Sequence, residues 1–351
     1  MSYKVIQWTT GHVGREAVKG ILGHPDLELV GAYAWSEQKV GRDVGELCGL
    51  DPIGIKATND VDALLSLGAD CVCYTPNSPD IDEMVPILEA GLNMVCSLFI
   101  TGSTLDEDVR SRLVQAAERG KASLFGSGIF PGFANFIAAL MATASRDFRC
   151  VRFLESVDLS HYEAFSNFAA LGWGQPPDEK WGEVNRTVLG PYSECIDLTA
   201  DLLGIPLTEK RFDYAFATTP DDREFFGFSV PANTIAGQKC TWTAMVDDEP
   251  AIELDVVWKA GNNLQPDWPL HHGYTMEVEG NPNIRTRVTF SPSGLKAEDP
   301  KAGGADLAHT VTAMPVISAI PAVCDAAPGI RTYADLPLIT GRYVHLPKQR
   351  S

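Results

Sequence analysis

Short apolar segments alternate with amphipathic segments through the first third of the chain. Continuous apolar runs predict buried strands at residues 3–8, 27–35, 69–76, 93–100 and 121–132. Segments with apolar residues at helical spacing separate them, at 14–25, 61–68, 81–92 and 104–120. Buried strands separated by helices are typical of a parallel sheet covered on both faces. We therefore expect a doubly wound α/β domain of the Rossmann type, with its ligand outside the carboxyl ends of the strands.

Longer segments with alternating apolar and polar residues begin near Cys150. They predict strands with one solvated face at residues 150–160, 210–220, 237–261 and 273–292. A helical segment lies at 181–205, and the apolar stretch 307–329 predicts a tail helix that ends at Gly329 and packs back on the first domain. We expect a first domain at 1–148, an α+β domain with a mostly antiparallel sheet at 149–303, and a returning segment at 304–351.

The charge of the chain limits its partners. It has 28 basic and 46 acidic residues, a formal net charge of −18 at pH 7. Nucleic acids and anionic membranes attract basic surfaces, so neither is expected as a partner. We expect no membrane span, which needs an apolar run of roughly 18 residues, and no secretory signal. None of the eight cysteines forms a C-x-x-C pair, which predicts reduced thiols, a cytoplasmic location and no metal site.

The stretch TTGHVG, residues 9–14, follows the first predicted strand and opens the first predicted helix. In the dinucleotide fingerprint, glycines serve a tight turn, the approach of a pyrophosphate and the contact of helix with strand. Gly11 and Gly14 match the second and third glycines, and Thr9 stands at the first. We expect the loop to bind phosphate through its backbone amides and the Thr9 and Thr10 hydroxyls, with His12 and Val13 at the helix start. The alternative is a tight turn with no ligand.

The end of the second predicted strand bears on the choice of cofactor. An NAD site commonly has a carboxylate there for the ribose 2′-hydroxyl, where this chain has Trp35 or Ser36. Ser36 can donate to a 2′-phosphate, and Lys39 and Arg42 can balance its charge, which favours NADP. Glu37 favours NAD instead, and the two cations could also be solvated loop charges.

Two further loops end strands at the same predicted edge. Thr75 and Pro76, within TPNSP, are expected near the pyrophosphate or the nicotinamide ribose. Gly128 and Phe130, within GSGIFPGF, are expected near the nicotinamide ring, where glycine permits close approach of the backbone. A plain strand-to-helix turn is the alternative for the second loop. Together these loops predict that the first domain binds a dinucleotide.

Five stretches carry a family resemblance: TTGHVGREA, HPDLELVGAYAWSEQKVGRDVGEL, GSGIFPGF, DLSHYEAFSNFAALGWG and TAMPVISAIPAVCDAAPGIRTYADLP. They resemble the dihydrodipicolinate reductase-like superfamily, and more closely its branch with 2,4-diaminopentanoate dehydrogenase and the native amine dehydrogenases. The resemblance implies NAD(P)-dependent redox chemistry at a C=O, C=N or amine-bearing carbon, in a homodimer that forms through the second domain.

Three positions depart from the family patterns. The amine dehydrogenases carry a glutamate after the fifth strand, where this chain has Ser97, Leu98 and Phe99. Phe130 stands in place of an asparagine. In the tail helix Ser318 also replaces an asparagine, and it either bonds the nicotinamide carboxamide or fills space. The pair His271 and His272 lies too late in the chain to match the paired histidines of true dihydrodipicolinate reductases.

The chemistry needs a group that orients the substrate and donates a proton when the cofactor supplies a hydride. Tyr162 occupies the place that the resemblance assigns to a tyrosine of the substrate pocket, and we rank it first. His161 ranks second because imidazole suits proton transfer near neutral pH, and Glu155 ranks third as an orienting carboxylate. The alternative is that neither residue donates a proton: Tyr162 only packs against the substrate, and His161 faces water.

The expected pocket is apolar and aromatic. Its candidate residues are Phe99, Phe130, Phe133, Phe165, Phe168, Trp173 and His272. We expect an NAD(P)H-dependent oxidoreductase, with NADP favoured, that transfers hydride to a bulky hydrophobic carbonyl, imine or activated alkene. The alternatives are reductive amination of the amine dehydrogenase type and a non-catalytic NADP-binding sensor or scaffold.

Overall fold

The computed structural model describes residues 2–162, 165–292 and 305–343. These residues form two compact units. The first contains the described residues up to Phe133 and those from His309 onward, and the second contains the described residues from Ala134 to Ala308. The sequence placed the first boundary at 148/149, whereas the units of the structure divide before Ala134.

A parallel sheet forms the centre of the first unit. Its described strands are β1 (Tyr3–Trp8), β2 (Leu27–Tyr33), β3 (Ala57–Thr58), β4 (Cys71–Tyr74), β5 (Asn93–Cys96), β6 (Ser123–Gly126) and β15 (Gly329–Arg331). Their order in space is β15-β6-β5-β4-β1-β2-β3, and each neighbouring pair is parallel. The strand order reverses direction between β1 and β4, which is where ligands bind in doubly wound sheets. The expected Rossmann-type sheet is confirmed.

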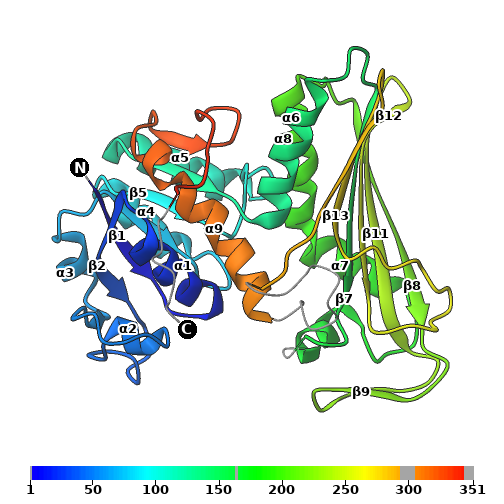
Figure 1. The fold of residues 1–351 in the computed structure, drawn as a ribbon, viewed down its shortest axis with the longest axis horizontal. Helices are drawn as coiled ribbons and strands as arrows, with labels where there is room; N and C mark the ends of the chain where they lie inside the picture. Colours follow the sequence, from blue (N-terminus) through cyan, green and yellow to red (C-terminus); the bar gives the residue numbers. More distant parts are fainter. Residues whose placement is uncertain (1, 163–164, 293–304, 344–351) are drawn as a thin grey trace, which may run out of the picture. The chain divides into compact units, whose positions relative to one another are not determined.

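Helices cover both faces of this sheet (Figure 1). They are α1 (His12–Gly23), α2 (Val44–Leu47), α3 (Val61–Leu65), α4 (Ile81–Glu89), α5 (Glu107–Gly120) and α9 (Ala305–Cys324). Asp60 and Asp80 cap α3 and α4 by accepting from backbone amides of the first turn. On one face α3, α4 and α5 enclose a core that includes Trp8, Val72 and Leu113. On the other face α9 packs against α1, where Met314 and Ile317 lie next to Gly20.

Helix α9 returns the chain to the first unit, as the sequence predicts. It ends at Cys324 rather than at Gly329, because Gly329 begins β15 and pairs with Ser123 of β6. The segment Leu307–Cys324 has a mean hydropathy of 1.6 and meets the length and composition of a membrane span. This corrects the expectation that no such run exists. Val316, Ile317, Ile320 and Val323 of α9 are buried inside the protein, as they are in a core helix.

The second unit is a mixed sheet with helices on one face. Its described strands and helices are β7 (Cys150–Asp158), β8 (Glu209–Thr218), β9 (Arg223–Phe225), β10 (Phe228–Val230), β11 (Ile235–Val246), β12 (Glu249–Lys259), β13 (Gly273–Glu279), β14 (Ile284–Val288), α6 (Ala134–Ala142), α7 (Glu179–Val188) and α8 (Glu194–Leu203), with the short helical turns η2 (Phe165–Leu171) and η3 (Gly190–Ser193). The order of the main sheet is β14-β13-β7-β12-β11-β8, antiparallel except for β7 with β12. Figure 1 shows α6 and α8 side by side along it.

Helix α6 belongs to this unit because its polar contacts lie there. Asn135 is buried and donates from Nδ2 to Thr199 Oγ1 at 3.1 Å and to the Cys195 backbone oxygen at 3.3 Å, both on α8. All eight cysteines are free thiols, as expected.

Candidate functional site

The loop between β1 and α1 has the backbone of a phosphate-binding turn. Thr9 has a φ of +72°, the left-handed region that glycine adopts most readily. A Cβ at Gly14 would lie 2.4 Å from the Thr9 carbonyl oxygen, so only glycine fits there. Gly11 has a φ of −72°, and a Cβ there would meet no atom within 4 Å. Thr9 therefore serves the turn of the first fingerprint glycine, Gly11 is open to a ligand, and Gly14 permits the contact of helix with strand.

Gln7 stabilises this loop through hydrogen bonds from its side-chain amide. It is fully buried on β1, and its Nε2 donates to Thr75 Oγ1 at 2.7 Å and to the Thr9 backbone oxygen at 2.9 Å. The Thr75 hydroxyl donates in turn to the Trp8 backbone oxygen at 3.2 Å. Thr75 thus braces the loop from the end of β4. Gln7 is not among the residues predicted from the sequence, although a lone amide inside an apolar strand is a visible signal.

The start of α1 suits an anion. Gly11 caps the helix without a side-chain hydrogen bond, and the first turn holds no acidic residue, so the helix dipole favours a negative charge. Thr10 is 1% exposed, and its hydroxyl has no hydrogen-bond partner among the described residues. These groups fit a phosphate of the cofactor that the fold implies.

Two cations lie beside the loop. Lys39 Nζ donates to the Thr10 backbone oxygen at 3.0 Å. Burial and the nearby Arg15 guanidinium lower the pKa of Lys39. Ser36 is half-buried, whereas Glu37 and Arg42 are exposed. Lys39 therefore contacts the loop directly, and Arg15, exposed on the first turn of α1, is close enough to affect its pKa. Glu37, the carboxylate within residues 34–42, is also exposed.

Asp43 holds the segment after β2 in place. Its carboxylate accepts from the backbone amides of Gly45 at 2.8 Å, Ile53 at 3.0 Å and Gly54 at 2.8 Å. These hydrogen bonds lower its pKa. Asp43, within the VGRDVGEL stretch, therefore stabilises the loop that carries Lys39.

The other predicted cofactor residues vary in placement. Pro76 is half-buried after β4, and Gly128 and Phe130 are buried at the turn after β6. Ser127 Oγ of this turn lies 2.7 Å from the Tyr333 hydroxyl. Ser318 is half-buried on α9, nine residues beyond His309 and level with the second half of α1.

The two leading proton-donor candidates follow β7 in the second unit. His161 is exposed, and Tyr162 is half-buried with its ring 5.7 Å from that of Phe168. The Tyr162 backbone amide donates to the Leu159 oxygen at 3.0 Å, which fixes the turn that presents the ring.

Glu155 is buried elsewhere in this unit. Its carboxylate accepts from Trp258 Nε1 at 2.8 Å and from the Tyr192 hydroxyl at 3.3 Å. Burial raises the pKa of Glu155 to about 7, and these two hydrogen bonds oppose the rise. The expected role of orienting His161 or Tyr162 finds no support in these contacts, because Trp258 and Tyr192 hold the carboxylate.

Several predicted pocket residues are core residues in this structure. Phe99 belongs to the core between the first sheet and its helices. Phe165 and Trp173 are fully buried, with their ring centroids 5.5 Å apart, and Trp173 Nε1 donates to Gln238 Oε1 at 2.7 Å. Phe133 is half-buried. Large apolar side chains predict burial, but the sequence alone does not distinguish a residue of the core from one that lines a pocket.

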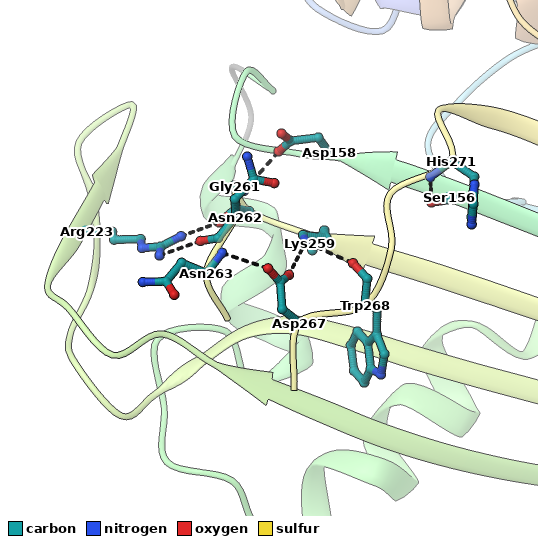
Figure 2. A network of polar contacts seen from close by, with 11 residues as sticks. Ser156, Asp158, Arg223, Lys259, Gly261, Asn262, Asn263, Asp267, Trp268 and His271 are labelled. Carbon is teal, nitrogen blue, oxygen red and sulfur yellow. Dashed lines mark hydrogen bonds and ion pairs between the residues drawn. The ribbon is translucent and has the colours of Figure 1, made fainter. Parts of the chain in front are cut away.

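His272 is exposed at the end of a loop that polar contacts fasten to the sheet (Figure 2). Lys259, 2% exposed, pairs with Asp267 and donates to the Trp268 backbone oxygen at 3.0 Å. Arg223 donates to the backbone oxygens of Ala260 and Asn262, at 2.9 and 2.7 Å. His271, the residue before His272, donates its backbone amide to Ser156 Oγ at 2.9 Å.

The sheet order of the first unit and its phosphate loop are those of a Rossmann-type dinucleotide-binding domain. Together with the relatives described next, they define the class of the chain, an NAD(P)-dependent oxidoreductase. Residues 5–126 match the family model of the dihydrodipicolinate reductase N-terminus. The match covers most of the first unit, and the resemblance seen in the sequence is confirmed.

Relatives extend the likeness to both units. The chain is 28% identical over 353 residues to an amine dehydrogenase of Streptomyces virginiae, covering 95% of this chain and 96% of the relative. It is 31% identical over 164 residues to the 4-hydroxy-tetrahydrodipicolinate reductase of Synechococcus elongatus, which covers 45% of this chain and 57% of that enzyme. The solved structure of an amine dehydrogenase from Mycobacterium smegmatis has the same fold, with a TM-score of 0.69 at 20% identity over 97% of this chain and 98% of that one.

Proposed function

We propose that the protein is an NADP-dependent reductase of a hydrophobic carbonyl, imine or activated alkene. The observation that carries the cofactor preference is the placement of Lys39 and Arg15 at the phosphate loop, where Lys39 bonds the Thr10 carbonyl. A 2′-phosphate needs cations and hydroxyl donors, whereas a 2′-hydroxyl needs a carboxylate acceptor. Among the described residues, no hydrogen bond or ion pair joins Glu37 to the loop, in contrast to Lys39.

The chain's own residues divide the work. Amides at the start of α1 and the Thr10 hydroxyl bind the phosphates, and Gln7 and Thr75 keep the loop in shape. The reduced nicotinamide, when bound, supplies a hydride to the substrate carbon. Tyr162 donates a proton to the substrate oxygen or nitrogen as negative charge develops there, with His161 as the second candidate donor. The aromatic neighbours of Tyr162, beginning with Phe168, favour an apolar substrate.

Cofactor titration tests the first half of the proposal. Fluorescence titration should give an NADPH affinity at least about tenfold above that for NADH, and Lys39→Ala should remove most of this difference. Loss of one hydrogen bond to a charged group costs about 1.5–3 kcal/mol, or roughly ten- to a hundredfold in affinity. Equal affinities for the two cofactors in the wild-type protein would overturn the preference for NADP.

A second assay tests catalysis. NADPH oxidation should be measured with a panel of hydrophobic ketones, aldehydes, imines and enones. Tyr162→Phe keeps the ring and removes the hydroxyl, so it should lower kcat by about a hundredfold or more while NADPH affinity stays unchanged. Tight NADPH binding without turnover on any member of the panel would favour the sensor or scaffold alternative.

Reductive amination is the second candidate, and the full-length similarity to an amine dehydrogenase favours it. Against it, no carboxylate follows β5, where the chain has Ser97, Leu98 and Phe99. Glu155 does not offer a ready substitute, because it is buried on β7 beneath Trp258 and Tyr192. Ammonia-dependent oxidation of NADPH in the presence of a ketone would establish amination, and a rate unaffected by ammonia would exclude it.

A further inference from the structure

The first turn of α1 lies beside the second turn of α9, which begins the returning part of the first unit. The imidazole of His12 stacks on that of His309, with ring centroids 4.8 Å apart and planes 20° apart. One residue further along α9, the Thr310 hydroxyl donates to Glu16 Oε2 at 2.9 Å. Gly20 faces Met314 and Ile317 in turn. Because contacts advance together along the two helices, α1 and α9 run side by side in the same direction.

The stacked histidines lie at the phosphate-binding end of α1. His12 is the first residue of the helix and follows Gly11, whose Cβ direction is open. The buried Thr10 hydroxyl, which has no hydrogen-bond partner within the described part of the chain, belongs to the same loop. His309 thus brings a ring from the far end of the chain to the loop that fits the cofactor phosphates.

The chemistry at this end suits a diphosphate. Imidazole offers ring N–H donors, and a diphosphate offers only acceptor oxygens near neutral pH. The nearby carboxylate, Glu16, is engaged by Lys19 at 2.7 Å and by Thr310, so its charge is compensated. We propose that His309, stacked on His12, is a cofactor-binding residue that contacts the diphosphate, so that the returning segment completes the cofactor site. This inference rests on the proposed NADP-dependent function.

Three ligands separate diphosphate recognition from the rest of the cofactor. NADPH and 2′-phospho-ADP-ribose contain the diphosphate, whereas 2′-AMP has the adenosine and the 2′-phosphate without it. His309→Phe keeps an aromatic ring for the stack and removes the N–H donors. It should weaken NADPH and 2′-phospho-ADP-ribose by the same factor, about tenfold, and leave the affinity for 2′-AMP within twofold.

Two controls guard against a merely structural effect. His24→Gln alters a histidine at the opposite end of α1 and should leave all three dissociation constants within twofold. The thermal midpoint of His309→Phe should match that of the wild type, because the stack and the Thr310 contact remain. If this variant binds all three ligands as the wild type does, the histidine only packs on His12 and the inference fails. If it weakens all three alike, the effect is not on the diphosphate, and the inference fails as well.

The failure of the proposed function gives a different result. In that case the wild-type protein itself does not bind NADPH or 2′-phospho-ADP-ribose. A double-variant cycle with His12→Ala adds a second check. The ring of His12 positions that of His309, so the two losses of NADPH affinity should be non-additive. Additive losses would contradict a joint role for the two rings.

Discussion

Three residues shape the loop between β1 and α1, each through a different physical constraint. Thr9 accepts a φ of +72°, Gly14 lacks the room for a Cβ, and Gly11 faces open space. A left-handed conformation is costly for a β-branched residue, and the Gln7 hydrogen bond to the Thr9 carbonyl helps to hold it. Thr9 therefore contributes to the shape of the loop at some expense of stability.

The two loop glycines should respond differently to alanine. Gly14→Ala places a Cβ 2.4 Å from the Thr9 carbonyl oxygen, so the loop must shift, and we expect a loss of about 1–3 kcal/mol of stability as well as weaker NADPH binding. Gly11→Ala meets nothing within 4 Å and should keep the thermal midpoint while NADPH affinity falls about tenfold, because the methyl group blocks the phosphate. Urea unfolding and cofactor titration measure both. Unchanged NADPH binding in Gly11→Ala would contradict a phosphate at this position.

Glu155 makes stability depend on pH. Its pKa rises from an ordinary 4.5 to about 7 because the carboxyl is buried. A folded state that holds this proton more tightly is favoured fully below about pH 4.5, and the contribution is lost as pH rises through 7. Glu155→Gln removes this titration. Its free energy of unfolding should rise relative to that of the wild type by up to about 3 kcal/mol between pH 5 and pH 8.

Urea unfolding at pH 5, 6, 7 and 8 measures this difference. Exposed Glu224 offers the matched control, since Glu224→Gln should keep a constant offset from the wild type across the range. Parallel curves for Glu155→Gln and the wild type would show that the core carboxyl does not titrate there.

The sequence predicts those site residues that a local motif defines. Thr9, Gly11 and Gly14 are recognisable because the turn, the strand before it and the helix after it are contiguous in the chain. The contacts of Gln7 with Thr75 and of His12 with His309 join distant segments, which a local pattern does not reveal. Glu155 was recognised as ionisable, but its partners Trp258 and Tyr192 come from other elements.

At the scale of the elements, the order of strands and helices in the first unit follows from periodicity, whereas several ends do not. The apolar run 93–100 predicts one strand, yet β5 ends at Cys96. Phe99 turns back toward β6, where its carbonyl oxygen would lie 1.5 Å from a Cβ on Gly126. Apolarity continues past the strand because Phe99 is still in the core, and burial alone cannot mark where the backbone leaves the sheet.

The loop that follows β12 depends on a buried ion pair, which leads to an asymmetric prediction. The Lys259 side chain is 2% exposed and that of Asp267 is 43% exposed. Asp267→Asn leaves a buried ammonium without its carboxylate and should cost about 2–3 kcal/mol, whereas Lys259→Met removes the buried charge and should cost about 1 kcal/mol or less. Urea unfolding compares the two variants, and hydrogen exchange should rise over residues 260–272 in Asp267→Asn. A larger loss in Lys259→Met would contradict the asymmetry.

At the scale of the whole molecule, the first unit is assembled from both ends of the chain. Its sheet closes with β15 after β6, and Ser123 Oγ donates to the Val323 backbone oxygen at 2.7 Å. The sequence predicts that an apolar tail returns, because such a helix needs a partner for its apolar surface. It does not predict the added strand, since three residues are too few for a periodicity to register.

The returning helix leads to a prediction about the unit as a whole. Ile317 is fully buried on α9 beside Gly20 of α1, so Ile317→Asn places an amide in the core and should cost about 3 kcal/mol or more. Leu338→Asn makes a similar change at a position that is 64% exposed in the same segment and should cost less than about 0.5 kcal/mol.

Because α9 supports α1, the Ile317→Asn protein should also lose most of the thermal stabilisation that saturating NADPH gives the wild type and the Leu338→Asn control. Scanning fluorimetry with and without NADPH measures both effects. If Ile317→Asn unfolds at the wild-type temperature with its NADPH shift intact, α9 does not stabilise the phosphate-binding helix.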